Sequence, residues 1–155
     1  MVFIIAFHGK PAVGKSTACQ HLLNCYGKDD VEIWDSIPDL NSAVEFDPER
    51  SLYYASNFRL NRVGIEINKI TKPILLISSI DNQEESDFVH GLGGIIVHLF
   101  RPEQINAKPL RKYEAIGDKI DKIDVFIKND TDLSSFLDRV KSNLSTIVDR
   151  QLELY

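Results

Sequence analysis

The sequence predicts an α/β fold, a three-layer sandwich around a mainly parallel sheet of five strands. Apolar runs alternate with amphipathic stretches along the chain, and the connections are short, which favours parallel strands joined by helices. Several of the apolar runs have no polar interruption, as is typical of strands covered on both faces. The 155 residues contain no repeat and no linker, so we expect a single domain over residues 1–155.

Five segments are predicted to be strands because β-branched and aromatic residues fill them and turn-forming residues follow them. They cover residues 2–7, 31–34, 73–80, 94–100 and 124–128. Gly9 and Pro11 end the first strand, and the pair Arg101-Pro102 ends the fourth. Because a strand with two apolar faces needs helices above and below it, the segments between these strands are expected to be helical.

The amphipathic segments between the strands are predicted to be helices. They cover residues 15–26, residues 49–70 with an irregular pattern, and residues 82–90. The last helix follows Asn129–Thr131, which offer N-cap side chains, and it is the most regular periodic segment of the chain. Its apolar stripe consists of Leu133, Phe136, Leu137, Val140, Leu144, Ile147 and Val148.

Charge and cysteine content exclude several classes of protein. The 18 basic and 23 acidic side chains give a net charge of -5, and non-specific binding of nucleic acid needs clustered cations. We therefore expect no nucleic-acid polymer as a partner, while a homodimer is left open. Cys19 and Cys25 form no C-x-x-C pair, and we interpret them as reduced packing residues on different sides of a helix in a cytoplasmic protein.

The apolar opening of the chain is predicted to be a strand and not a targeting segment. Residues 1–7 lack a basic stretch and a small-residue cleavage site, and they are far shorter than the ~20 residues that span a bilayer. No membrane partner is therefore expected. His8 and His98 lie on apolar strands, and we interpret them as core or loop histidines and not as metal ligands.

A phosphate-binding motif follows the first strand. Residues 9–17 match G-x-x-x-x-G-K-[ST] between a predicted strand and a predicted helix, which is the context that this motif needs. Backbone N–H groups of such a loop surround a phosphate, and the amino end of the helix adds its dipole. The residues predicted to bind the nucleotide are Gly9, Lys10, Pro11, Ala12, Val13, Gly14, Lys15, Ser16 and Thr17. Lys15 is expected to reach the β and γ phosphates, and the Ser16 hydroxyl to coordinate Mg²⁺.

The sequence lacks the motifs of two other classes of nucleotide-binding protein. No G-x-G-x-x-G follows a strand, which argues against a Rossmann dinucleotide site. A GTPase normally carries Asn-Lys-x-Asp after a late strand, whereas the strand over residues 124–128 is followed by Asn129-Asp130. A phosphate loop without these motifs leaves a kinase, an ATPase and a binding protein as candidates.

The chain resembles the P-loop nucleoside monophosphate kinases, most closely the phage-type deoxynucleoside monophosphate kinases, with dephospho-coenzyme A kinase as a more distant relative. Besides the phosphate loop, the similar segments are the apolar strand ending in Arg101-Pro102, the segment Arg111-Lys-Tyr-Glu114, and Asp124-Val-Phe-Ile-Lys-Asn129-Asp130. The resemblance implies a P-loop NTPase sandwich that uses ATP and Mg²⁺. It also implies a reduced lid, because few residues separate Pro102 from Asp124.

The resemblance implies further site residues. Asp35 falls where the family places a residue facing the acceptor, and Asp81 where an acid positions Mg²⁺. Arg101 and Arg111 flank the stretch that covers the donor phosphates, where cations neutralise the transferred group. Asn129 and Asp130 would line the adenine end of the donor. Simpler roles stay open at these positions: helix caps for both aspartates, a solvated turn for Arg101 and a solvated face for Arg111.

The acceptor site has the weakest support in the sequence. Arg50, Arg59 and Arg62 alternate with aromatic residues, and guanidinium groups bind a monophosphate while rings stack on a base. An amphipathic helix with solvated arginines explains the same pattern. The family has an arginine after the acid at Asp81, whereas Asn82 follows it here. We expect a kinase of a nucleoside or deoxynucleoside monophosphate; a dephospho-coenzyme A kinase-like enzyme, a nucleotide-binding regulator or degenerate kinase, and a partner-coupled ATPase are the alternatives.

Overall fold

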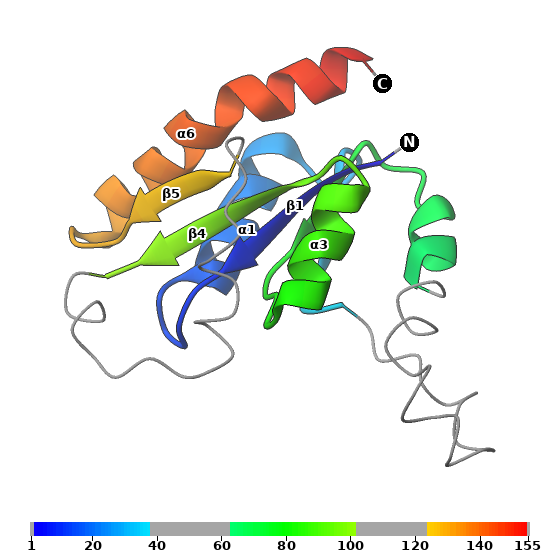
Figure 1. Ribbon diagram of the computed structural model, residues 1–155. Coiled ribbons are helices and arrows are strands. Elements are labelled where there is room, and N and C mark those ends of the chain that lie inside the picture. Colours follow the sequence, from blue (N-terminus) through cyan, green and yellow to red (C-terminus); the bar gives the residue numbers. More distant parts are fainter. Residues whose placement is uncertain (1, 38–62, 102–123, 155) are drawn as a thin grey trace, which may run out of the picture.

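Five strands form one parallel sheet in the computed structural model, which describes residues 2–37, 63–101 and 124–154 (Figure 1). The strands are β1 (Phe3–His8), β2 (Val31–Trp34), β3 (Ile74–Ile77), β4 (Ile95–Phe100) and β5 (Val125–Lys128). Their order in the sheet is β2-β3-β1-β4-β5, and every neighbouring pair is parallel. The predicted fold class, with five strands in a parallel sheet, is confirmed.

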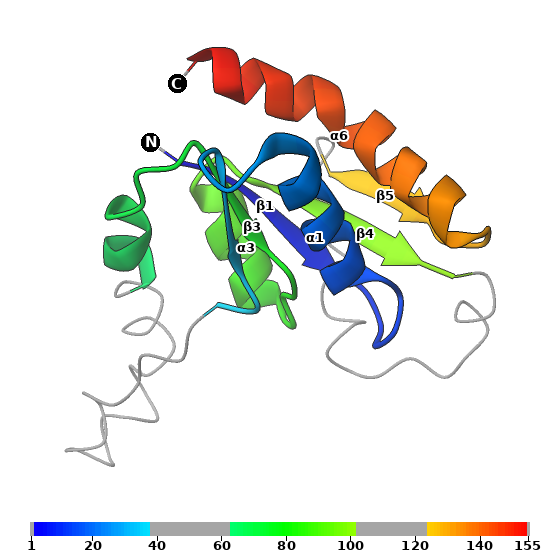
Figure 2. The same ribbon diagram turned by 180° about the vertical axis from the view of Figure 1, so that it is seen from behind.

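Helices cover both faces of this sheet. They are α1 (Lys15–Tyr26), α3 (Gln83–Gly91) and α6 (Leu133–Leu154), and a short helix spans residues 63–68. Helix α3 lies in front of the sheet in Figure 1, whereas α1 lies in front of it in the reverse view of Figure 2, together with α6. Of the helix predicted over residues 49–70, only the end lies within the described residues.

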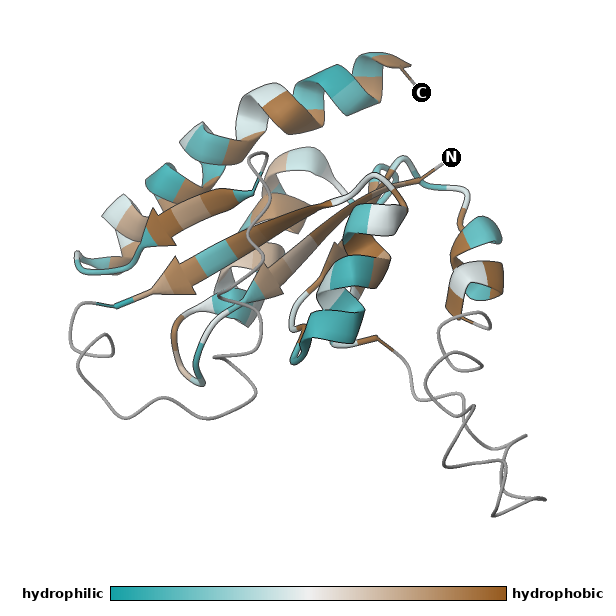
Figure 3. Cartoon of the chain, viewed as in Figure 1, coloured by the Kyte–Doolittle hydropathy of each residue, from teal (hydrophilic) through white to brown (hydrophobic). Residues whose placement is uncertain are grey.

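Among the described residues, the core consists of two apolar clusters, one on each face of the sheet. Successive residues of β1 alternate between them: Ile5 and Phe7 pack with α1 and α6, whereas Ile4 and Ala6 pack toward α3. In Figure 3 the strands are mainly hydrophobic, whereas hydrophobic and hydrophilic residues alternate along the helices. Burial on both faces explains why the strands are apolar at every position.

Three predicted details of these elements are wrong. Strand β3 ends at Ile77, not at residue 80, although the Ser78 N–H still donates to Trp34 O of β2 at 2.8 Å and the Ile80 N–H to Phe7 O of β1 at 3.0 Å. Asp132 caps α6 in place of residues 129–131: its Oδ1 accepts from Ser135 N at 2.8 Å. The first residue of that helix, Leu133, is 62% exposed and not part of the core.

The two cysteines face different sides of α1, as predicted, but only one of them is a packing residue. Cys19 is 1% exposed in the core, and burial raises the pKa of its thiol to about 12. Cys25 is exposed, with its Sγ 3.6 Å from Nε2 of His21. In the described part of the chain, we find no helix with the length and apolar character needed to cross a membrane.

Candidate phosphate-binding site

The motif loop joins β1 to α1 at the carboxyl edge of the sheet, where β1 and β4 end side by side (Figure 1). Val13 is fully buried beneath the loop and joins the same apolar cluster as Phe7. Gly14 has φ 105°, in the left-handed region that favours glycine, and Ala12 has φ 64°. A non-glycine residue held in this region is typical of functional loops.

Two glycines of the motif lie where a larger residue does not fit. A Cβ on Gly14 would lie 3.0 Å from Cε2 of Phe136 and 3.2 Å from Nδ2 of Asn129. A Cβ on Gly9 would lie 2.6 Å from the backbone oxygen of Leu99. The loop backbone therefore packs directly against β4 on one side and against α6 on the other.

Replacing Gly9 with alanine is expected to lower the free energy of unfolding by about 1–3 kcal/mol, as overpacking of a filled core does. The obstacle is backbone of the central sheet, which cannot move aside as the end of a side chain can. Urea unfolding of Gly9→Ala measures the effect. Gly91→Ala is the matched control, because nothing lies within 4 Å of a Cβ built at Gly91. Equal stabilities of the two variants would contradict the packing of the loop against β4.

The amino end of α1 is arranged to receive an anion. Within α1, no side chain caps the first turn, which contains no acidic residue. The N-cap residue is Gly14, and the exposed side chains of Ser16 and Thr17 follow it. Because the first N–H groups of a helix lack partners within the helix, this end attracts a phosphate through its N–H groups and its dipole.

A pocket of about 280 Å³ opens at the loop. Its lining residues are Ala12, Gly14, Lys15, Ser16, Thr17, Arg101, Asn129, Leu133 and Phe136. Lys15 Nζ donates to the Gly9 carbonyl at 2.6 Å, which holds the ammonium group against the loop. Arg101, directly after β4, brings a second cation to the same pocket. Two cations and a helix amino terminus in one pocket suit a polyphosphate.

Asn129 holds the loop in place from the far edge of the sheet. Its Nδ2 donates to the Val13 carbonyl at 3.0 Å, and its backbone N–H donates to Phe100 O at 2.8 Å. The predicted adenine-side role of Asn129 stays a prediction, but its side chain also braces the loop, which sequence analysis missed. No local pattern indicates this contact, because 116 residues separate its two partners.

Asp130, predicted beside Asn129 at the adenine end, points into an ion-pair cluster. Its carboxylate lies 2.8 Å from Arg139 Nη1 and 3.2 Å from Lys128 Nζ. Hydrogen bonds from Arg139 and then from Lys128 lower the pKa of Asp130. Asp130 is not among the residues that line the pocket at the loop.

The two candidate acids lie at the carboxyl edge of the sheet. Asp35 directly follows β2 and is exposed. Asp81 follows β3 and is half-buried, with its Oδ1 3.4 Å from Ser79 Oγ. The N-cap of α3 is Asn82, whose Oδ1 accepts from Glu85 N at 2.9 Å, so the capping role considered for Asp81 is wrong. A role in positioning Mg²⁺ stays a prediction for Asp81.

The remaining predicted site residues lie outside the described residues. They are Arg50, Arg59, Arg62 and Arg111. The lid expected between residues 102 and 123 lies there as well. Among the described residues, the structure brings together the loop, Arg101 and Asn129, and it places both aspartates at the same sheet edge as the loop.

His8 and His98 are buried, as predicted for core histidines, but they belong to a polar cluster. Their Nδ1 atoms lie 3.2 Å apart, and His98 Nε2 lies 3.4 Å from Asp124 Oδ2. Burial lowers the pKa of His8 to about 4, with further lowering by His98 and Lys15 and an opposing effect of Asp81. Burial also lowers the pKa of His98, against the effect of Asp124. Sequence analysis missed this cluster, and an acid placed directly before an apolar strand was its signal.

The residues of the site fit ATP and Mg²⁺. The pocket at the loop carries Lys15 and Arg101 in its lining, and the amino end of α1 supplies N–H donors. Ser16 offers a hydroxyl beside Lys15, and Asp81 offers a carboxylate at the same sheet edge. Hydroxyl and carboxylate oxygens are ligands that Mg²⁺ takes when it also binds substrate phosphates.

The sheet order, the loop and its pocket define a P-loop kinase-like α/β fold. A dephospho-CoA kinase from Campylobacter jejuni is similar to it, with a TM-score of 0.58 and 14% identity over 96% of this chain and 98% of that chain. A gluconokinase from Sinorhizobium meliloti is similar at a TM-score of 0.52 and 11% identity, over 98% of this chain and 97% of that chain. A sugar kinase from Janibacter is similar at a TM-score of 0.51 and 11% identity, over 94% of this chain and 95% of that chain.

At these identities the similarity is one of fold. No protein-family model matches the chain. No curated protein matches it by sequence.

Proposed function

We propose that the protein is a P-loop kinase that transfers a phosphoryl group from ATP to a nucleoside or deoxynucleoside monophosphate. The observation that carries this proposal is the joint placement of the phosphate loop, Lys15, Ser16 and Arg101 around one pocket. Phosphoryl transfer needs little covalent chemistry from the protein, so a site that positions and neutralises phosphates has the parts that the reaction needs. The kinases of similar fold support the same class of reaction.

Each residue of the pocket has a role in this proposal. Lys15 contacts the β and γ phosphates, and Arg101 neutralises charge on the transferred group. Ser16 and Asp81 are the residues that would hold Mg²⁺, which when bound screens the charge of the donor phosphates. Asp35, exposed at the end of β2, faces the acceptor. Arg50, Arg59, Arg62 and Arg111 complete the proposed acceptor and donor contacts.

A second candidate, favoured by the start of α3, is a nucleotide-binding regulator or a kinase with a different acceptor. Asn82 and Gln83 stand where the resembled family has an arginine, and both are engaged within their helix. Asn82 caps the helix, and Gln83 Nε2 donates to Asp87 Oδ1 at 2.8 Å. An acceptor monophosphate therefore lacks one guanidinium contact that the resembled family would supply here.

Coupled measurement of ADP release tests the proposal. The protein is incubated with ATP and Mg²⁺ against a panel of nucleoside and deoxynucleoside monophosphates, dephospho-coenzyme A and a no-acceptor control. We expect one monophosphate to raise the rate at least about tenfold over the control, because hydrolysis without an acceptor lacks the positioned nucleophile. Calorimetric titration with ATP and Mg²⁺ measures binding independently of turnover.

The outcomes separate the candidates. Stimulation by dephospho-coenzyme A alone would replace the nucleotide acceptor with that molecule. ATP binding with equal rates across the panel would overturn the kinase and favour the regulator, or an ATPase if the control itself turns over. Absence of ATP binding would overturn every candidate that uses the loop.

A further inference from the structure

A row of buried and half-buried polar side chains connects α3 and the residue before β5 with the end of β1. His90 Nε2 lies 2.9 Å from Asp124 Oδ1, His98 Nε2 lies 3.4 Å from Asp124 Oδ2, and the Nδ1 atoms of His98 and His8 lie 3.2 Å apart. His8 is the residue before Gly9, so the row ends where the phosphate loop begins. The α3 face of the sheet otherwise carries an apolar cluster, so a row of polar side chains is unusual there.

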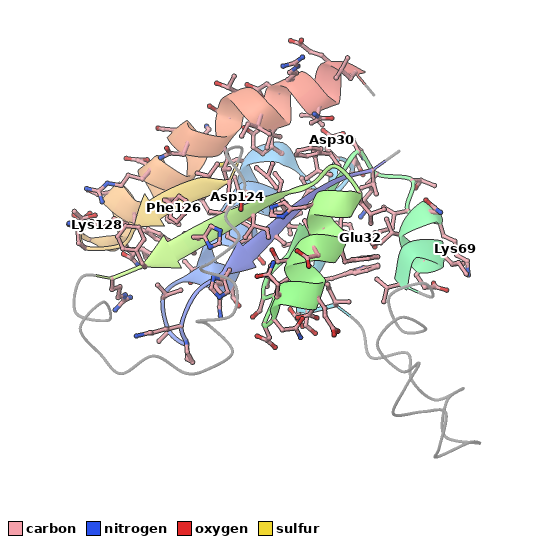
Figure 4. All side chains as sticks on the ribbon, in the orientation of Figure 1. Asp30, Glu32, Lys69, Asp124, Phe126 and Lys128 are labelled. Carbon is pink, nitrogen blue, oxygen red and sulfur yellow. The ribbon has the colours of Figure 1, made fainter. Side chains whose placement is uncertain are left out.

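The ionised carboxylate of Asp124 accepts hydrogen bonds and cannot donate one. The Ile96 N–H donates to its Oδ1 at 3.0 Å, and its side chain is 1% exposed. Asp124 lies directly before β5, which pairs with β4, and Phe126 lies within β5 (Figure 4). A buried carboxylate with fixed donors is therefore held against the edge of the His98 ring.

Neighbouring rings fix the orientation of His98. Phe126 stacks on it with ring centroids 4.7 Å apart and an angle of 16° between the planes. The His8 ring stands nearly perpendicular, at 80° with centroids 5.3 Å apart. His8 and His98 are also register neighbours on paired strands, so their backbones cannot slide apart. Each nitrogen of His98 thus has an assigned neighbour: Asp124 for Nε2 and His8 for Nδ1.

The positions of the protons follow from these neighbours. A carboxylate needs a donor, so His98 carries its proton on Nε2. A neutral imidazole then accepts at Nδ1, so His8 must donate from its own Nδ1. The neutral His8 ring consequently has a lone pair, and no proton, on Nε2. Burial keeps both rings neutral by lowering the pKa of each histidine.

We propose that Asp124 is a positioning residue, which sets the tautomer of His98 and, through it, that of His8 at the entrance of the phosphate loop. Lys15 and Asp81 are the charged groups that act on the His8 ring from the loop and from the segment after β3. A proton on His8 Nε2 would repel the Lys15 ammonium and attract the Asp81 carboxylate. This relay, which runs from Asp124 through His98 to His8, therefore sets the electrostatic influence of His8 on Lys15 and Asp81, a consequence that rests on the proposed function.

Nitrogen NMR of the unmodified protein tests the tautomers directly. Protonated and unprotonated imidazole nitrogens have well-separated ¹⁵N shifts, and long-range ¹H–¹⁵N correlation distinguishes Nδ1 from Nε2. The chain has four histidines, and His8→Gln and His98→Gln assign the two signals of interest. Near neutral pH we expect protonated Nε2 in His98 and protonated Nδ1 in His8. The opposite pattern in either ring would overturn the relay.

Asp124→Asn tests the control of the tautomer. Asparagine keeps an oxygen for the Ile96 N–H and for His90, so the fold is expected to persist. Its NH₂ group replaces Oδ2, which forces His98 Nε2 to accept and moves the protons to Nδ1 of His98 and Nε2 of His8. The matched control is Asp87→Asn on the exposed surface of α3. An unchanged His8 tautomer in folded Asp124→Asn would overturn the proposal, and the unmodified protein decides it if that variant does not fold.

The consequence for the loop is measured as affinity for ATP with Mg²⁺. We expect about tenfold weaker binding in Asp124→Asn, in the range found for residues that orient a ligand's direct partners, and unchanged binding in Asp87→Asn. An inverted tautomer with unchanged affinity would overturn the positioning role. If the unmodified protein binds ATP but phosphorylates no acceptor, the proposed function fails while the relay stands on the ring spectra and the affinities.

Discussion

Lys15→Ala is expected to remove phosphoryl transfer, with a fall in kcat/KM of at least about a thousandfold, because one preorganised charge on the transferred group is lost. The Lys15 Nζ also donates to the Gly9 carbonyl at 2.6 Å, a bond that closes the loop. Losing that bond costs about 1 kcal/mol, so the variant is expected to fold. Coupled ADP release with the acceptor identified from the panel measures the effect.

The control for this variant is Lys141→Ala, which removes an exposed lysine from α6 without touching the loop. It changes the net charge of the chain equally, so a general electrostatic effect on nucleotide binding would move both variants together. Circular dichroism verifies folding. Turnover retained by folded Lys15→Ala would disprove the assigned role of the loop lysine and the mechanism that depends on it.

Acidification from about pH 7.5 to about pH 4.5 is expected to lower the free energy of unfolding through His8, by up to about 3 kcal/mol over its full window. Burial, His98 and Lys15 lower the pKa of His8 from 6.5 to about 4 in the folded chain, against the pull of Asp81. Between these pH values the unfolded chain binds a proton that the folded chain does not. The contribution of His8 to the free energy of unfolding is therefore complete above pH 6.5 and is lost as the pH falls toward about 4.

Urea unfolding at several pH values in this window measures the loss, and His8→Asn is the variant that identifies its source. The variant has no imidazole at this position, so at least about half of the pH dependence is expected to disappear. His98, whose pKa is also lowered, accounts for part of what remains. The pKa values of Asp130 and Asp132 are lowered too, so these acids act below the window. An unchanged pH dependence in His8→Asn would contradict the neutral buried ring.

Strand and helix positions followed from the sequence because each depends on neighbours within a few residues. The apolar run before Gly9 predicts a doubly covered strand, and β1 occupies Phe3–His8. The spacing of Phe136, Val140 and Leu144 predicts a helix, and all three are buried in α6. Errors of detail arose where several residues offered the same local chemistry: Asp132 caps α6 although three residues before it have cap-forming side chains.

The fold class, the sheet of five strands and the phosphate-loop motif could be predicted from the sequence alone, because periodicity and the G-x-x-x-x-G-K-[ST] spacing are contained in short windows. The strand order, the contact of Asn129 with Val13 and the row from Asp124 to His8 became visible only in the three-dimensional structure. These contacts join residues far apart in the chain. They form because the apolar strands assemble into one sheet in which β1, β4 and β5 lie side by side. Local propensity does not indicate which strands pair.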